Sequence, residues 1–136
     1  MQRDTPGATV MGPAERFTGD AYVTPIHAVQ PPSRLTVGLV RFTPGARSFW
    51  HHHGLGQTLV CTEGFGFVAT RDGTVIRLRA GESVWTPPGE EHWHGATEGT
   101  VMCHYAMVEQ PDDGAPATTW LEEVTDAQYR SAHQTP

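Results

Sequence analysis

Apolar and polar residues alternate in short runs along most of the chain, and each run is bounded by glycine or proline. The clearest alternations span residues 34–42 and 101–108, where every second side chain belongs to one face. A period of two over this length is typical of half-buried β-strands. Weaker or shorter runs predict further strands at residues 17–29, 48–53, 57–61, 65–70, 75–79 and 83–86.

Turn and cap signals separate these runs. Asp72-Gly73 lies between two alternating segments and predicts a tight β-hairpin. Near the C-terminus, Thr125 precedes Gln128 by three residues, which fits a capping box and predicts a short helix over 125–132. We expect one domain over 1–136, with a loose or edge-strand arm at 1–13 and a barrel over about 34–110.

Composition supports a small all-β domain. The 136 residues include 15 glycines and 11 prolines, while only 18% are charged, which favours many strands and turns in a sandwich or barrel. A net charge of −6 provides no basic surface for nucleic acid. Neither a bilayer-spanning apolar run nor a secretory signal pattern is present, so we expect no membrane partner and a cytoplasmic location.

The two cysteines, Cys61 and Cys103, are too few for a disulfide scaffold. The strand phases place their side chains on opposite faces, so we expect two free, buried thiols. Other isolated residues receive no catalytic role: His27 is expected at an edge and His133 in a frayed tail. Three tryptophans flank the histidine-rich segments and are expected to pack at the barrel mouth: Trp50, Trp85 and Trp93.

Histidines at alternate positions suggest a metal site. In an extended strand His51 and His53 share one face, while the residue between them points away. A third nitrogen from His92 and the amide oxygen of Gln57 would complete a mixed site for a divalent metal. A solvated histidine-rich loop is the simpler alternative.

Two spaced motifs resemble those of the cupin superfamily. The first reads Gly45, five residues, His51-x-His53, three residues, Gln57, six residues, Gly64; the second reads Gly81, five residues, Pro87-x-Gly89-x-x-His92. Gln57 stands where cupins usually carry glutamate. From about Gly12 to Arg130 the chain is similar to small bacterial cupins that act as manganese-dependent hydroxynitrile lyases.

This resemblance implies a jelly-roll barrel that encloses the metal and pairs into a homodimer or higher homo-oligomer. It implies Mn2+ as the ion, with Fe2+, Zn2+, Ni2+ and Co2+ as other candidates. It also implies that His104 is the general base for cyanohydrin cleavage and that Ser48 and His94 line the site. Strand phase adds three apolar residues to the substrate pocket: Val40, Leu59 and Met102.

The donor set bears on the chemistry. All four expected ligands are neutral, so a bound dication would keep nearly its full charge and act as a strong Lewis acid. Three alternatives remain open: a polyketide cyclase in which His104 is a further ligand, a dioxygenase with a redox-active metal, and a binding protein without turnover. Val108 departs from the lyase pattern, where a glutamine is usual.

Overall fold

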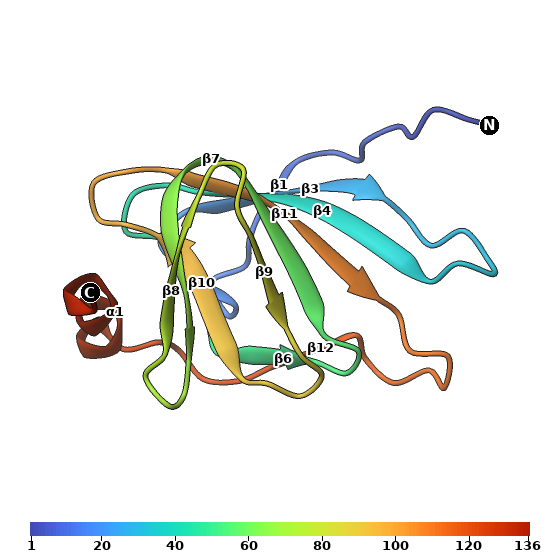
Figure 1. Ribbon diagram of the computed structural model, residues 1–136. Coiled ribbons are helices and arrows are strands. Elements are labelled where there is room, and N and C mark those ends of the chain that lie inside the picture. The colour runs from blue at the N-terminus through green and yellow to red at the C-terminus, as the bar shows by residue number, and fades with distance from the viewer.

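Twelve strands and one helix form the computed structural model, which describes residues 1–136 (Figure 1). In chain order they are β1 Val10–Met11, β2 Phe17–Thr18, β3 Ala21–His27, β4 Leu35–Phe42, β5 Arg47–Ser48, β6 His51–His53, β7 Gln57–Thr70, β8 Val75–Arg79, β9 Ser83–Thr86, β10 His92–Ala96, β11 Met102–Glu109, β12 Thr118–Trp120 and α1 Asp126–Gln134. The nine-residue helix is too short to cross a bilayer.

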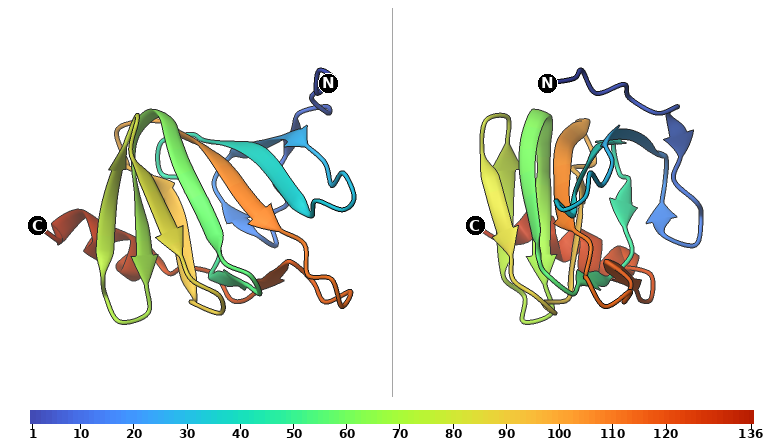
Figure 2. Two further views of the ribbon diagram at one scale, coloured as in Figure 1. Left: turned by 45° about the vertical axis from the view of Figure 1, so that its right-hand side comes forward. Right: turned by 90° about the vertical axis from the view of Figure 1, so that its right-hand side faces the viewer.

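Strand β7 ties the two layers of the sheet together. Its first half pairs with β11 and β9, whereas its second half pairs with β10 and β8. All these pairings are antiparallel, and the main path runs β1-β3-β4-β11-β7-β10-β5-β2. The sheet therefore curls on itself, and the side views show the two layers facing each other (Figure 2).

The interior between the layers is filled by the residues that the alternation assigns to one face. Val40 pairs with His104, and His104 pairs with Cys61, so all three side chains point the same way. These positions belong to, or lie beside, a buried apolar cluster that includes Phe42 and Met102. The prediction of an all-β fold with a short C-terminal helix is confirmed.

Helix α1 covers a second apolar cluster outside the barrel. Thr125 and Gln128 form the predicted capping box, and the helix continues to Gln134. His133 is therefore not frayed, as the sequence had suggested: its ring packs 4.8 Å from the Tyr129 ring, and its Nδ1 lies 3.1 Å from the Tyr129 carbonyl oxygen. The Arg77 guanidinium also donates to the carbonyl oxygens of His133 and Thr135, which holds this last turn in place.

The placement predicted for the tryptophans is wrong. Trp50 and Trp93 are buried in the cluster beneath α1, and Trp85 is 57% exposed on the outside of β9. Alternation along a strand gives only the face on which each side chain lies. It does not reveal that α1 packs over the face that carries Trp50 and Trp93. The predictions for the cysteines are confirmed in that Cys61 and Cys103 are both buried and free.

The expected strand over residues 48–53 is divided into β5 and β6. Both pair with β10, through Arg47↔Gly95 and His51↔His92. Between these two pairs, the segment from β5 to β6 contains one residue more than β10 does. This extra residue is a bulge, which reorients the chain before His51. The short strand β12, which pairs with β6, was not among the predicted runs. Strand β1 pairs with β3 at the end of the sheet, so the N-terminal arm takes the edge-strand alternative.

Candidate metal centre and its cavity

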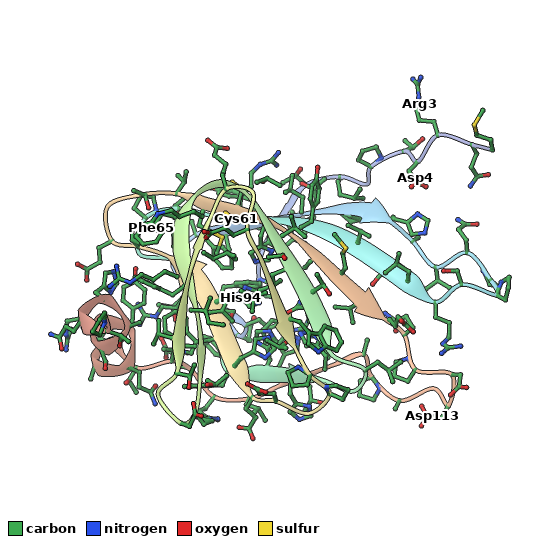
Figure 3. All side chains as sticks on the ribbon, in the orientation of Figure 1. Arg3, Asp4, Cys61, Phe65, His94 and Asp113 are labelled. Carbon is green, nitrogen blue, oxygen red and sulfur yellow. The ribbon has the colours of Figure 1, made fainter.

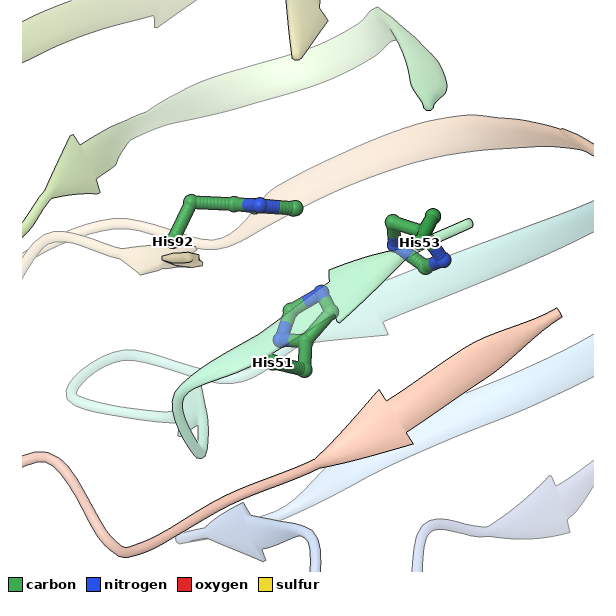
Figure 4. Close-up of side chains that lie close together, drawn as sticks. All are labelled: His51, His53 and His92. Carbon is green, nitrogen blue, oxygen red and sulfur yellow. The ribbon is translucent and has the colours of Figure 1, made fainter. Parts of the chain in front are cut away.

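Three histidines from two paired strands converge inside the barrel. His51 and His53 alternate on β6, and His92 lies directly opposite His51 on β10. Each offers a ring nitrogen, and these atoms all lie within 4.8 Å of one another. Figure 4 shows the three rings facing a common space.

Backbone carbonyl groups fix the tautomer of every one of these rings. The Nδ1 atoms of His51 and His92 lie 2.9 Å from the carbonyl oxygens of Phe49 and Glu90, and that of His53 lies 3.3 Å from Ala117. A carbonyl oxygen only accepts, so in these contacts each Nδ1 carries the proton and each Nε2 keeps its lone pair. The Nδ1 of His53 also lies 3.0 Å from the Thr118 hydroxyl oxygen, which can accept from the same N–H. Anchoring the outer nitrogen in this way is typical of metal-binding histidines.

Gln57 completes the donor set. Its side chain is buried at the start of β7, and its Oε1 lies 3.1 Å from the Nε2 atom of His92. Because both atoms bear lone pairs, a cation shared between them would stabilise their approach. The Nε2 atom of His53 is also buried and has no hydrogen-bond partner. The four side chains therefore fit a divalent metal ion.

Burial keeps these histidines neutral. It lowers the pKa of His92 to about 4, and burial followed by the neighbouring His92 lowers the pKa of His51 well below its usual value. The pKa of His53 is lowered by burial as well. Neutral imidazoles are the form that binds a metal, so no proton needs to be displaced near pH 7.

A second pair of histidines lies beside the cluster. The Nε2 atom of His104 is 2.9 Å from the Nδ1 atom of His94, and both side chains are buried. The ring centroids of His94 and His51 are 5.0 Å apart. Burial lowers the pKa of both His94 and His104, the latter to about 4, so this pair is neutral too.

Two of the candidate metal-binding histidines, His51 and His53, line the floor of a cavity of about 380 Å³, and the His92 ring packs against both of them. Its lining includes the buried residues His51, His53, Gln57 and His94, of which His94 is labelled inside the barrel in Figure 3. The exposed lining residues Val10, Pro13 and Arg16 form its rim. Much of the wall between them is apolar or small. A cavity of this volume falls in the range of small-molecule sites.

Only some of the predicted pocket residues reach this cavity. Val40 and His94 line it, whereas Leu59 and Met102 are buried in the core cluster behind it. Ser48 is also buried away from the lining, but its Oγ accepts a hydrogen bond from the backbone N–H of His94 (3.2 Å). His104 does not line the cavity and approaches it through His94.

Sequence reasoning missed the rim of the cavity. Phe17 and Trp120 form an aromatic wall with ring centroids 5.8 Å apart, and Arg16 lies beside them. The Trp120 ring lies 4.7 Å from the His51 ring, so the wall reaches the metal-binding floor. The β-branched Thr118-Thr119 pair before Trp120 was a strand signal, but it could not reveal pairing with β6.

Comparison with known proteins places the chain in a family. The family model described as "Cupin domain" matches residues 38–109, which is more than half of the chain. The chain belongs to the cupin family. A cupin-like protein of known structure from Thermotoga maritima is 32% identical to this cupin and superposes on it with a TM-score of 0.82. The match covers 97% of this chain and 95% of the Thermotoga chain. This likeness confirms the predicted jelly-roll barrel.

Two further relatives differ in what they support. A protein from Granulicella tundricola named (R)-mandelonitrile lyase is 44% identical over 123 residues, which are 90% of this cupin and 92% of the relative. A cupin 2 conserved barrel domain protein from Rhodopseudomonas palustris is only 14% identical, with a TM-score of 0.70 over 94% of this chain and 84% of its own. The latter supports the fold alone.

Proposed function

We propose that this cupin is a metal-dependent hydroxynitrile lyase, which cleaves a cyanohydrin to an aldehyde and cyanide or catalyses the reverse addition. The observation that carries the proposal is the set of three Nε2 lone pairs and one amide oxygen at the floor of a small, largely apolar cavity. The 44% identity to a protein named (R)-mandelonitrile lyase supports this substrate class.

The residues that would hold the metal are His51, His53, His92 and Gln57. A dication bound there supplies Lewis acidity, which stabilises negative charge as it develops on departing cyanide. Because all four side chains are neutral, they leave that charge undiminished, as a glutamate at position 57 would not. We propose Mn2+ as the ion, following the family resemblance.

The buried histidine pair supplies the base. His94 borders the cavity, and its Nε2 atom is buried without a hydrogen-bond partner. If its Nδ1–H donates to His104 Nε2, the Nε2 lone pair of His94 is free to accept the hydroxyl proton of the cyanohydrin. The predicted base, His104, then acts through His94 by fixing its tautomer and sharing the incoming proton.

The arrangement favours this function over the cyclase alternative. A cyclase of the kind considered would use His104 as a fourth histidine ligand, but His104 is outside the group of converging nitrogen atoms and directs Nε2 at His94. No comparable observation favours dioxygenase chemistry or binding without turnover.

Cleavage of racemic mandelonitrile tests the proposal. Metal-stripped protein should release benzaldehyde no faster than buffer, whereas protein reloaded with manganese should release it rapidly and leave one enantiomer in excess. Reloading in parallel with iron or zinc would show which ion supports turnover. Absence of release from protein with bound metal would contradict the proposal.

We also propose a homodimer in the cytoplasm. Alternate residues of β4 and β11 present half-buried apolar side chains on the outer face of the sheet: Val37, Leu39, Tyr105 and Met107. A second copy packed on this face would remove them from water, and light scattering of the eluted protein would give its mass. The two free cysteines suit a reducing compartment.

A further inference from the structure

Arg16 is a permanent cation at the exposed end of the cavity, and the lining contains no carboxylate to neutralise it. Three of the other eight arginines are paired with acids: Arg34 with Glu109, Arg47 with Asp126, and Arg71 with Glu91 and Glu122. Arg16 forms no such pair, and its side chain makes no hydrogen bond within the chain. Its guanidinium donors are therefore available to a ligand.

The backbone around Arg16 is held firmly at this place. Its N–H donates to the Pro13 carbonyl oxygen (3.0 Å), and its own carbonyl oxygen accepts from the N–H of Phe49 (2.8 Å). The guanidinium carbon lies 5.4 Å from the centre of the Trp120 ring, within the range of a cation–π contact. Trp120 in turn lies against His51. An unbroken row of contacts thus links the cation at the rim to the metal-binding floor.

The charge of the cavity contrasts with that of the whole protein. The chain has a net charge of −6, yet the cavity is lined by one arginine, neutral histidines and uncharged residues. A dication held by neutral donors would add two more positive charges to the same space. Low-dielectric walls strengthen such a field, which attracts anions and disfavours cations.

We propose that the substrate carries a carboxylate at the end remote from its reacting carbon, and that Arg16 binds this carboxylate at the rim. The aromatic wall of Phe17 and Trp120 lies between the two ends, so the substrate class is a carboxylate-bearing aromatic cyanohydrin or aldehyde. The assignment rests on the proposed function for the reacting end. The guanidinium fork suits a carboxylate because it can donate two parallel hydrogen bonds.

Binding of two matched probes to the metal-stripped full chain tests this assignment. The probes are 4-(hydroxymethyl)benzoate and 4-(hydroxymethyl)benzamide, which share the ring and the hydroxyl group but differ in charge. By calorimetry, the benzoate should bind about five- to tenfold more tightly, as one charge-assisted contact near the surface would give. The preference should shrink as salt is raised.

Variants identify the residue responsible. Arg16→Gln should reduce the preference to about one, and Arg16→Lys should retain part of it. Arg79→Gln is the matched control, because Arg79 is also exposed and stacks on an aromatic ring, Phe65, away from the cavity. It should leave the ratio unchanged. An unaltered preference in Arg16→Gln, or equal binding of both probes by the unmodified protein, would overturn the assignment.

The test is independent of turnover because metal-stripped protein is used. A carboxylate preference that depends on Arg16, combined with no cleavage of any cyanohydrin by reloaded protein, would overturn the lyase proposal and leave the rim assignment standing. Cleavage of mandelonitrile without a carboxylate preference would overturn the rim assignment and leave the lyase proposal standing.

Discussion

The floor and the rim of the cavity are built in different ways. At the floor, His51, His53 and His92 are at most 3% exposed, and a backbone carbonyl group anchors each ring. At the rim, Arg16 is exposed, and residues 10–18 around it add only the two-residue strands β1 and β2 to the sheet. The floor is preorganised by paired strands and anchored rings, whereas the rim is held by two short strands and a few backbone hydrogen bonds.

This difference separates two properties of the protein. In the proposed function, the rigid, neutral donors at the floor would select the ion and support the reaction. In the same proposal, the exposed Arg16 at the rim touches none of those donors and would influence which substrate binds. Changes at the floor should abolish the reaction, while changes at the rim should alter its selectivity.

The largest effect is expected from His53→Ala. Removal of this nitrogen leaves an incomplete ligand set, so metal affinity should fall by at least about 100-fold and turnover should fall to that of stripped protein. Elemental analysis after dialysis measures the metal content. His52→Ala is the matched control, since that side chain lies on the same strand and points away from the cluster. Retention of the metal by His53→Ala would remove this residue from the ligand set.

His94→Ala and His104→Ala should reduce kcat by about 100- to 10 000-fold, the range for loss of a general base. Both variants should retain metal, because neither histidine belongs to the converging group. Elemental analysis and steady-state kinetics on the same samples separate the two effects. Loss of metal from His104→Ala would instead support its role as a ligand.

Acid should destabilise the stripped protein through its buried histidines. A histidine with a lowered folded-state pKa binds fewer protons when folded than when unfolded, so its stabilising contribution is complete above pH 6.5 and is lost as the pH falls to about 4. For His92 and His104, each with a pKa lowered to about 4, the loss is about 3 kcal/mol apiece. Urea unfolding at pH 7 and pH 4.5 would measure it.

The acid effect also sharpens the comparison between the two regions. Arg16→Gln should show the same pH dependence as the unmodified protein, because arginine stays charged throughout this range. His104→Phe, which removes one buried titrating ring, should show a shallower loss. A stability that does not change between pH 7 and 4.5 would contradict the assignment of neutral buried histidines.

The smallest effect is expected from Trp120→Ala. Loss of the aromatic wall should raise KM for aromatic cyanohydrins by about tenfold and change kcat less, since ring contacts contribute about 1 kcal/mol each. Aliphatic cyanohydrins should be less affected, and Trp120→Phe should restore most of the binding. An equal rise in KM for both substrate classes would argue against a stacking role.

Local patterns revealed the floor but not the rim. Alternation put His51 and His53 on one face, and the capping box located the start of α1, because both signals depend on residues close in sequence. Trp120 and Arg16 come together through pairing of β12 with β6 and of β2 with β5. Such long-range contacts leave no period in the sequence.

The spatial neighbours of the predicted site residues could not be derived from the sequence either. Parity correctly placed His104 and Val40 on the interior face, but only the structure shows that His94 lies between His104 and the cavity. Leu59 and Met102 share that face and still contribute to the core, because the cavity occupies only part of the interior. Alternation along a strand shows which face of the sheet a residue lies on, but not whether it lies at the level of the cavity or of the packed core.

Titration of manganese into stripped protein, with mandelonitrile cleavage and bound metal measured on each sample, tests the central claim most directly. Turnover should rise linearly with bound ion and reach its plateau at one ion per chain, and His53→Ala should show neither binding nor turnover. Full activity in the stripped protein, or one tightly bound ion per chain without any cleavage, would contradict the claim that this neutral histidine–glutamine floor carries a metal-dependent lyase reaction.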